Sequence, residues 1–282
     1  MKLQEFVRPQ SVEAAREALK ALGRGGMALA GGTALHFMQN QTPVTAVDIT
    51  RLGLSYIREE EGGYRIGATT PIADIQRYRA PRWALHEICR RMATHQIRNI
   101  STIGGNISRV FPWADLPVVL LAMGAEMSIA GDAGETAVGA DEYFAEQPAK
   151  RFLGGDLLVS VKVPALAAHH GFGSVKVVRT SAAFSMVTVA AWLGLEGNVI
   201  REARVAAGAA LPFPRRLPEV EAALKDKEAC GRVFLEAAKA GAGAARWRGR
   251  EGMSEEYSRH LASVTIHDAL ERAAQFAKER TA

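Results

Sequence analysis

Cysteine is scarce in this chain of 282 residues, which contains two, Cys89 and Cys230. They lie far apart, and neither has a second cysteine beside it in a C-x-x-C arrangement. Cysteine therefore cannot assemble a zinc site or an iron–sulfur cluster here, and any such centre would be held by another chain. Cys89 falls in an apolar pattern with helical spacing, so we expect it to pack as a small hydrophobe.

Long hydrophobic runs are also missing. No stretch approaches the roughly 18 apolar residues of a membrane-spanning helix. Residues 1–10 show neither the basic start and apolar core of a secretory signal nor a twin-arginine pattern. The sequence thus predicts no membrane span and a cytoplasmic location. The apolar fraction of 48% is typical of a globular protein, and the length suits one large domain or two of ordinary size.

A strong charge bias is absent as well. The formal net charge is +5, but lysine and arginine are spread along the chain together with aspartate and glutamate. This favours a solvated surface and predicts no nucleic-acid partner. The densest basic segment, residues 246–250, could dock an acidic partner or form an exposed loop.

Two glycine-rich turns are the most informative features present. The first is Leu-Ala-Gly-Gly-Thr-Ala-Leu at 29–35, and the second is Ile-Ser-Thr-Ile-Gly-Gly-Asn-Ile-Ser at 100–108. Paired glycines let backbone N–H groups approach a phosphate, and the hydroxyl or amide that follows can add a hydrogen bond. Either turn alone would most often be an ordinary tight turn. Two of them favour one extended ligand, such as the diphosphate of a dinucleotide.

Periodicity predicts a mixed α and β protein. In the first fifty residues we expect a helix capped by Ser11, a strand at 27–30, helical spacing at 34–38 and a strand at 44–49, as in a βαβ-like unit. Next come a strand at 64–68, amphipathic and apolar helices at 82–93 and 116–123, and strands at 126–129 and 157–163. An alternating segment at 174–178 leads to strands at 186–195 and 204–207, and the last seventy residues are expected to be helical.

Three further features bear on chemistry. Asp115 precedes the apolar helix, where a carboxylate can accept hydrogen bonds from a ligand. His169 and His170 could suggest a metal site, but adjacent side chains in an extended segment point opposite ways and no third ligand lies near in sequence, so a loop is expected. A nicotinamide-binding fingerprint of the G-x-G-x-x-G kind is absent.

Several ordered motifs together resemble those of a known family, the FAD-binding medium subunits of molybdenum hydroxylases, which include xanthine dehydrogenase and carbon monoxide dehydrogenase flavoproteins. The similar segments are 30–33, 101–107, 115–117, 208–224 and 257–261. The resemblance covers nearly the whole chain. It implies an α+β fold in which a two-subdomain FAD-binding domain of the vanillyl-alcohol oxidase (PCMH) type is followed by a C-terminal α+β domain. The expected domains are 1–168, with subdomains of about 1–52 and 53–168, and 169–282.

The resemblance also implies cofactor contacts. The loop around the FAD diphosphate would comprise Leu29, Ala30, Gly31, Gly32, Thr33, Ala34 and Leu35. A second wall would comprise Thr102, Gly105, Asn106 and Ser108. Asp115 would hold a polar part of the flavin nucleotide, Met92 and Ala93 would lie near the isoalloxazine, and Leu158 and Lys176 would make later contacts.

Lys176 is of particular interest, because a cation at the N1/C2=O edge of a flavin stabilises the anionic reduced ring. The alternative is a surface lysine on an exposed strand. Two alanines depart from the family pattern. Ala34 stands where an acidic or polar residue is common, and Ala183 stands near an expected aspartate.

The implied function is electron transfer. FAD would take electrons from a small [2Fe–2S] subunit and pass them to NAD or another acceptor, while a large molybdenum-cofactor subunit would carry out hydroxylation. A self-sufficient flavin oxidase is one alternative, although the residues after the flavin domain are few for a substrate domain. A scaffold subunit that has lost its flavin is the other, suggested by the two alanines.

Overall fold

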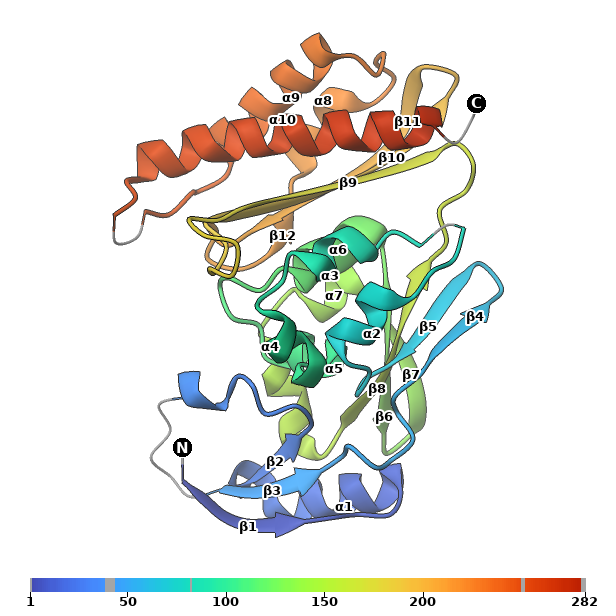
Figure 1. The fold of residues 1–282 in the computed structure, drawn as a ribbon, viewed down its shortest axis with the longest axis vertical. Coiled ribbons are helices and arrows are strands. Elements are labelled where there is room, and N and C mark those ends of the chain that lie inside the picture. The colour runs from blue at the N-terminus through green and yellow to red at the C-terminus, as the bar shows by residue number, and fades with distance from the viewer. Residues whose placement is uncertain (1, 39–43, 82, 250–251, 280–282) are drawn as a thin grey trace. The chain divides into compact units, whose positions relative to one another are not determined.

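The computed structural model describes residues 2–38, 44–81, 83–249 and 252–279. The chain forms two compact units whose segments are interleaved in the sequence (Figure 1). Unit 1 comprises Met1–Arg77, Thr94–Val110 and Glu126–Val163, and unit 2 comprises Tyr78–Ala93, Phe111–Ala125 and Pro164–Ala282. Residues 78–93 and 111–125 thus belong to the same compact unit as the C-terminal part of the chain.

Unit 1 begins with a parallel three-stranded sheet in the order β1-β3-β2. Its elements are β1 (Leu3–Val7), α1 (Val12–Leu22), η1 (Gly23–Gly25), β2 (Gly26–Leu29) and β3 (Val44–Asp48). The Ser11 side chain accepts a hydrogen bond from Ala14 N, so Ser11 is the predicted N-cap. Ala15 and Leu19 of α1 pack against Val47. The helix after Ser11 and the strands near 27–30 and 44–49 are confirmed. The strand–helix–strand unit, however, is β1-α1-β2, and β1 is a strand that the sequence pattern did not reveal.

The helical spacing expected at 34–38 gives only a short 3₁₀ helix, η2 (Leu35–Phe37). Gly32 has a φ of +64°, so the backbone turns sharply just before this segment. The chain there is held as a loop, with one 3₁₀ turn closing it. A helix whose N-terminus would face an anion is therefore not formed at this position.

The second sheet of unit 1 has five strands in the order β4-β5-β8-β6-β7. They are β4 (Ile57–Glu60), β5 (Gly63–Gly67), β6 (Glu126–Gly131), β7 (Gly134–Gly139) and β8 (Leu157–Pro164). The helical elements are α2 (Ile72–Arg77), α4 (His95–Ile100), α5 (Ile103–Ser108), α7 (Ala140–Tyr143) and η3 (Pro148–Gly154). Ile66, Met127 and Val161 are completely buried and form part of the core of this unit.

The amphipathic helix expected over 82–93 is shorter in the structure. It comprises α3 (His86–Arg90) of unit 2, while Arg82 lies outside the described residues. Ala93 adopts a φ of +44°, which a helix cannot accommodate, and α4 begins two residues later in unit 1. Cys89 is completely buried in α3, which confirms that it packs as a small hydrophobe.

Unit 2 contains an antiparallel sheet in the order β12-β11-β10-β9. Its strands are β9 (His170–Val177), β10 (Val187–Glu196), β11 (Val199–Gly208) and β12 (Arg215–Arg216). Helices α8 (Pro218–Leu224), α9 (Gly231–Ala244) and α10 (Glu255–Glu279) lie on one face, and α6 (Leu116–Met123) packs against β10 and β11 from the other (Figure 1). With both faces covered, β10 is buried almost throughout, which explains its continuous apolar sequence.

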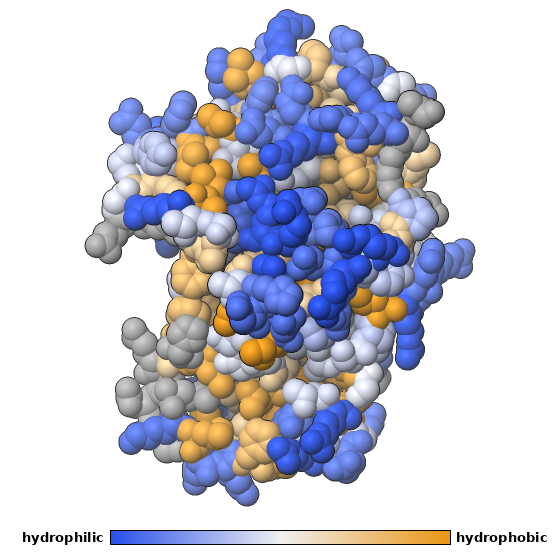
Figure 2. All heavy atoms as spheres, viewed as in Figure 1, coloured by the Kyte–Doolittle hydropathy of each residue, from blue (hydrophilic) through white to orange (hydrophobic). Residues whose placement is uncertain are grey.

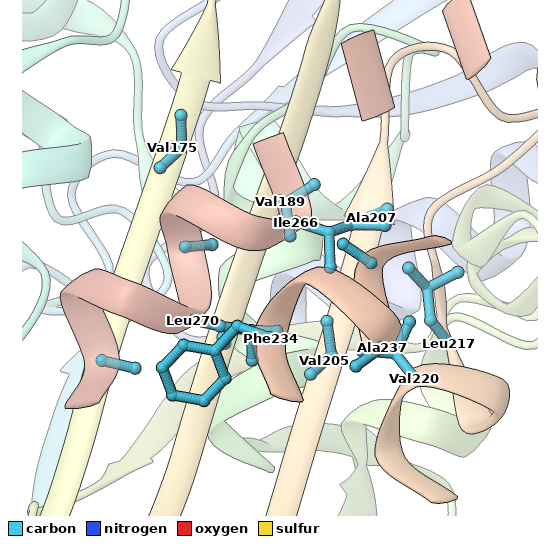
Figure 3. Close-up of a cluster of buried hydrophobic side chains, with 14 of the residues drawn as sticks. Val175, Val189, Val205, Ala207, Leu217, Val220, Phe234, Ala237, Ile266 and Leu270 are labelled. Carbon is cyan, nitrogen blue, oxygen red and sulfur yellow. The ribbon is translucent and has the colours of Figure 1, made fainter. Parts of the chain in front are cut away.

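The core of unit 2 lies between the sheet and the C-terminal helices. Val175 and Val189 are cross-strand neighbours, and they face Ile266 and Leu270 of α10 and Phe234 of α9 (Figure 3). Gly171 and Gly173 lie on the same face of β9. A Cβ at Gly173 would be 2.3 Å from the carbonyl oxygen of Ala269, so glycine permits α10 to lie directly on the strand.

The surface has a mixed character, and hydrophilic and hydrophobic residues both occur on the face shown in Figure 2. No described helix is both long and apolar enough to cross a membrane. In the basic segment at 246–250, Trp247 is buried and Arg248 N donates to Ala210 O, while Arg250 lies outside the described residues. The described part of this segment is thus anchored to the body of unit 2.

We expect Gly173→Ala to lower the free energy of unfolding by about 3 kcal/mol, because the added methyl group must push α10 away from β9. The matched control is Gly243→Ala in α9, where a Cβ meets nothing within 4 Å. That change should leave stability equal or raise it by about 0.5–1 kcal/mol, as alanine favours helix. Urea unfolding of the full chain measures both. Equal effects of the two substitutions would refute the proposed packing constraint.

Candidate functional site

The first glycine turn follows β2, and its two glycines are needed for different reasons. Gly32 adopts the left-handed backbone region, which residues with a Cβ rarely enter. Gly31 lies against the peptide bond that precedes Ser101, because a Cβ there would be 2.0 Å from the carbonyl oxygen of Ile100. The turn thus rests directly on the backbone of the segment before α5.

Four successive backbone N–H groups of this turn, from Gly31 to Ala34, make no hydrogen bond to any described residue. The next one, Leu35 N, closes the turn on Gly32 O at 3.1 Å. These four residues are half-buried. Consecutive unpaired amides in a turn with mixed right- and left-handed residues form a concave site for anions. The first turn therefore has the arrangement that a diphosphate requires.

The second glycine turn is built differently, which corrects the expectation that both turns present free amides. It forms the first turn of α5, where the Thr102 hydroxyl accepts from Gly105 N at 3.1 Å. The neighbouring amides of Ile103, Gly104 and Asn106 all donate to backbone carbonyls. A Cβ at Gly104 would lie 2.6 Å from Ala68 O, so this glycine serves the packing of α5.

Because its amides are paired, the second turn can contact a ligand only through its side chains. The Asn106 side-chain oxygen Oδ1 is buried and has no hydrogen-bond partner among the described residues. A buried unpaired acceptor is costly, so it calls for a donor from a ligand or from water. Ser108 ends α5 and is half-buried, whereas Gly105 is exposed.

Unit 1 therefore brings the two turns together. The Thr33 and Ser101 hydroxyls lie 2.8 Å apart, in addition to the contact of Gly31 with the Ile100 peptide. Leu29 is the last residue of β2, directly before the first turn. Leu158, the other predicted residue of this unit, lies in β8 opposite Ile129 and is 3% exposed.

The predicted residues of unit 2 centre on Asp115, the residue before α6, which is 4% exposed. Its Oδ2 lies 2.6 Å from Nζ of Lys176 in β9. Its Oδ1 accepts hydrogen bonds from the hydroxyls of Ser185 at 2.5 Å and Thr188 at 2.7 Å. Lys176 and Thr188 are directly opposite each other in the β9–β10 register, so both point to the α6 face. The alternative of a surface lysine is wrong, because Lys176 is 5% exposed.

Met92 and Ala93 belong to the same unit and follow α3. Met92 is buried, and Ala93 has a positive φ in the connection between α3 and α4. The side chain of the preceding Arg91 reaches the backbone carbonyl of Lys176. This connects the end of α3 to the strand that holds the buried lysine.

Sequence reasoning missed Ser185 and Thr188, and it also missed an aromatic group in unit 2. The ring of Trp113 lies between those of Phe111 and Phe184, with centroid separations of 5.3 and 4.6 Å. A signal for Thr188 was present, since it is a hydroxyl within an otherwise apolar strand. Nothing in the spacing of the aromatic residues indicated that 111, 113 and 184 would meet.

The histidine pair has no metal-site geometry. His169 lies in a turn, but His170 begins β9, so the expected loop is wrong for His170. The centroid of the His170 ring lies 4.6 Å from that of Trp192, and its Nδ1 accepts a hydrogen bond from Ala167 N. Burial lowers the pKa of His170, and the nearby His169 lowers it further. Within the described ranges, no group of three or more potential metal-ligating His, Cys, Asp or Glu residues is present.

Comparison with known proteins places this arrangement in a class. A family model described as "FAD binding domain in molybdopterin dehydrogenase" matches residues 1–166, and one described as "CO dehydrogenase flavoprotein C-terminal domain" matches residues 175–273. The first match covers more than half of the chain. The fold and both matches define a two-part flavoprotein.

Individual relatives agree with this class. The glyceraldehyde dehydrogenase medium chain of Sulfolobus acidocaldarius is 33% identical over 77% of this chain and 79% of its own length. The carbon monoxide dehydrogenase medium chain of Afipia carboxidovorans is 29% identical over 97% and 98% of the two chains. A solved structure of carbon monoxide dehydrogenase from Hydrogenophaga pseudoflava superposes with a TM-score of 0.90 at 28% identity, covering 97% of each chain.

The chain belongs to the family of FAD-binding medium subunits of molybdenum hydroxylases. This confirms the resemblance, the α+β fold and FAD as the cofactor, and it makes the chain part of an FAD-dependent oxidoreductase. The described residues fit FAD on physical grounds, because four unpaired amides suit its diphosphate and the buried Asn106 oxygen suits a ligand donor. The Asp115 carboxylate, in contrast, already has three donors within the protein.

We expect Gly31→Ala to weaken FAD binding by at least about tenfold, because the methyl group would displace the turn from the Ile100 peptide and misdirect its amides. Titration of the flavin-free chain with FAD, followed by flavin fluorescence, measures this loss. Gly139→Ala is the control, since a Cβ there meets nothing within 4 Å. Unchanged affinity in Gly31→Ala would rule out the turn as the diphosphate site.

We expect Asp115→Asn to lower stability by about 3–5 kcal/mol, because it leaves the buried Lys176 cation without its partner. The double variant Asp115→Asn/Lys176→Met removes the stranded charge and should recover much of the loss. Chemical unfolding of the wild type, Asp115→Asn, Lys176→Met and the double variant completes a thermodynamic cycle. Additive losses in the double variant would mean that the ion pair is not the source of the effect.

Proposed function

We propose that this chain is the electron-transfer subunit of a molybdenum-containing dehydrogenase complex. Its FAD would receive electrons from the [2Fe–2S] centres of a small subunit and pass them to NAD or another acceptor. Substrate oxidation would take place at the molybdenum cofactor of a large subunit. The single observation that carries this proposal is the match, over 97% of this chain and 98% of the relative, to a chain named as the medium chain of carbon monoxide dehydrogenase.

The scarcity of cysteine is consistent with this role. With two distant cysteines the chain lacks the thiolate ligands of an iron–sulfur cluster, so a [2Fe–2S] centre that feeds the flavin would be held by another subunit. The relatives are named for different substrates, including carbon monoxide, glyceraldehyde and nicotine. Similar medium chains therefore occur in complexes that oxidise unlike molecules, which favours substrate selection by another subunit.

When bound, FAD would supply the redox chemistry, since it can exchange electrons one or two at a time. The protein's own part is binding and orientation. The Gly31–Ala34 amides would hold the diphosphate, with Thr33 adding a hydroxyl and Leu29, Ala30 and Leu35 shaping the turn. The other predicted contacts, at Met92, Ala93, Thr102, Gly105, Asn106, Ser108, Asp115, Leu158 and Lys176, remain part of this proposal.

The state of Lys176 affects how it would act on a flavin. Its ammonium group is paired with the Asp115 carboxylate at 2.6 Å, so the two together carry no net charge. A neutral pair has a weaker field than a lone cation, and that field depends on its orientation. We propose that Lys176 would stabilise a reduced flavin less than an unpaired lysine would.

We propose a division into domains at 168/169, a position that lies between the two family-model matches at 1–166 and 175–273.

Both alternative functions have less support. A self-sufficient oxidase is less supported, because the relative that matches 97% of this chain is named as a medium chain of a dehydrogenase. A flavin-free scaffold would have no need to keep four unpaired amides in the first turn.

The test is to purify the chain with the proteins that accompany it and to record its visible spectrum. We expect bound flavin, a small iron–sulfur protein and a large molybdenum protein. Anaerobic addition of the complex's substrate should bleach the flavin only when all three are present. NADH should bleach the flavin of the isolated chain if NAD is the acceptor, and should leave it oxidised if another acceptor serves.

Two outcomes would overturn the proposal. A lone chain that oxidises an organic substrate with full activity would identify an independent oxidase. A colourless chain that does not take up added FAD would identify a scaffold.

A further inference from the structure

Ser101 occupies a junction that no predicted ligand set includes. Its backbone N donates to Ile97 O of α4 at 2.8 Å, and its carbonyl accepts from Ile72 N of α2, also at 2.8 Å. Its side-chain hydroxyl lies 2.8 Å from that of Thr33 in the first glycine turn. Because both of its backbone groups form hydrogen bonds, Ser101 is held in place by α4 and α2. Its side-chain hydrogen bond to Thr33 in turn restrains the first glycine turn.

The turn needs such an anchor, because it has little internal support. The amides of Gly31 to Ala34 make no hydrogen bond to described residues, and the one amide that closes the turn is Leu35 N. Gly31 is limited by steric contact with the Ile100 carbonyl, which stops the turn from moving closer but does not stop it from moving away. The Thr33–Ser101 hydrogen bond supplies the missing attractive restraint.

The hydrogen bond between the Thr33 and Ser101 hydroxyls also determines which of the two can donate its proton to a ligand. One of the two O–H groups is the donor in the bond, and the other remains free to donate elsewhere. If Ser101 donates to Thr33 Oγ1, the Thr33 proton is free for a phosphate oxygen, and this bond would then be a charge-assisted one.

We propose that Ser101 is a positioning residue for the FAD diphosphate: it fixes Thr33 and holds the four free amides of the first turn in place before the cofactor arrives. This rests on the proposed binding of the diphosphate at Gly31–Ala34. Preorganisation of this kind strengthens binding because less conformational freedom is lost when the ligand binds. Because Ser101 acts on the diphosphate-binding turn, it should affect the affinity only of ligands that carry a diphosphate.

The test uses the flavin-free full chain and two probes, FAD and ADP, the second of which has the diphosphate and adenosine without the flavin. Ser101→Ala should raise the Kd for both by the same factor, about five- to tenfold, which is the typical effect of one hydrogen bond. Ser101→Thr keeps the hydroxyl and should restore affinity. The spectrum of bound FAD should stay unchanged, because the flavin ring is not the affected part.

Controls separate positioning from a general loss of structure. Ser128→Ala removes a buried hydroxyl elsewhere in unit 1, where it bonds Arg65, and should leave both Kd values unchanged. Thr33→Val should itself weaken binding. Adding Ser101→Ala to it should cost nothing further, because the bond is already broken.

The outcomes distinguish the inference from the function on which it rests. A wild-type chain that binds neither probe overturns the diphosphate site and the inference with it. A wild-type chain that binds both probes, with Ser101→Ala equal to it, overturns the positioning role alone. Weaker binding of FAD with unchanged binding of ADP also overturns it, since the effect would then lie outside the diphosphate.

Discussion

The arrangement of the two glycine-rich turns depends on close contacts between backbone segments that leave no room for a side chain. Gly31 lies on the Ile100 peptide, and Gly104 lies on Ala68, each closer than any Cβ would permit. The Gly31 contact packs the first glycine turn against the segment before α5. The Gly104 contact packs α5 against the loop that follows β5. Glycine in both turns is thus required by the protein's own packing, whatever it binds.

The same principle has a different result in each turn. In the first turn, the packing leaves four amides without a hydrogen bond to any described residue, so they are available to a ligand. In the second turn, every amide from Ile103 to Asn106 is paired within the protein. One turn is therefore suited to bind an anion through its backbone, while the other supports it and contributes side chains. Similar glycine-rich sequences have produced unlike chemistry because their neighbours differ.

Much of the fold was accessible from the sequence, and the exceptions have physical reasons. Ser11 as an N-cap, β3, β10 and the apolar helix α6 follow from local patterns that the tertiary structure reinforces. β1 was missed because its residues are mostly exposed and show no clear alternation. The helix expected over 82–93 was too long, since α3 comprises only His86–Arg90. The positive φ at Ala93 excludes a helix that continues to this residue, and no local pattern indicates a positive φ at alanine. The pairing state of individual amides was beyond reach, since it depends on contacts between distant segments.

In unit 2, the hydrogen bonds of Asp115 could not be deduced from its position in the sequence motif. The resemblance implied that Asp115 would hold a polar part of the flavin nucleotide, and its oxygens accept hydrogen bonds from Lys176, Ser185 and Thr188. A buried carboxylate must be compensated, and three donors from β9, β10 and the segment between them provide this. An additional ligand donor would have to share an oxygen already bonded. Asp115 therefore joins α6 to the sheet, and its proposed contact with the cofactor would come in addition to these three hydrogen bonds.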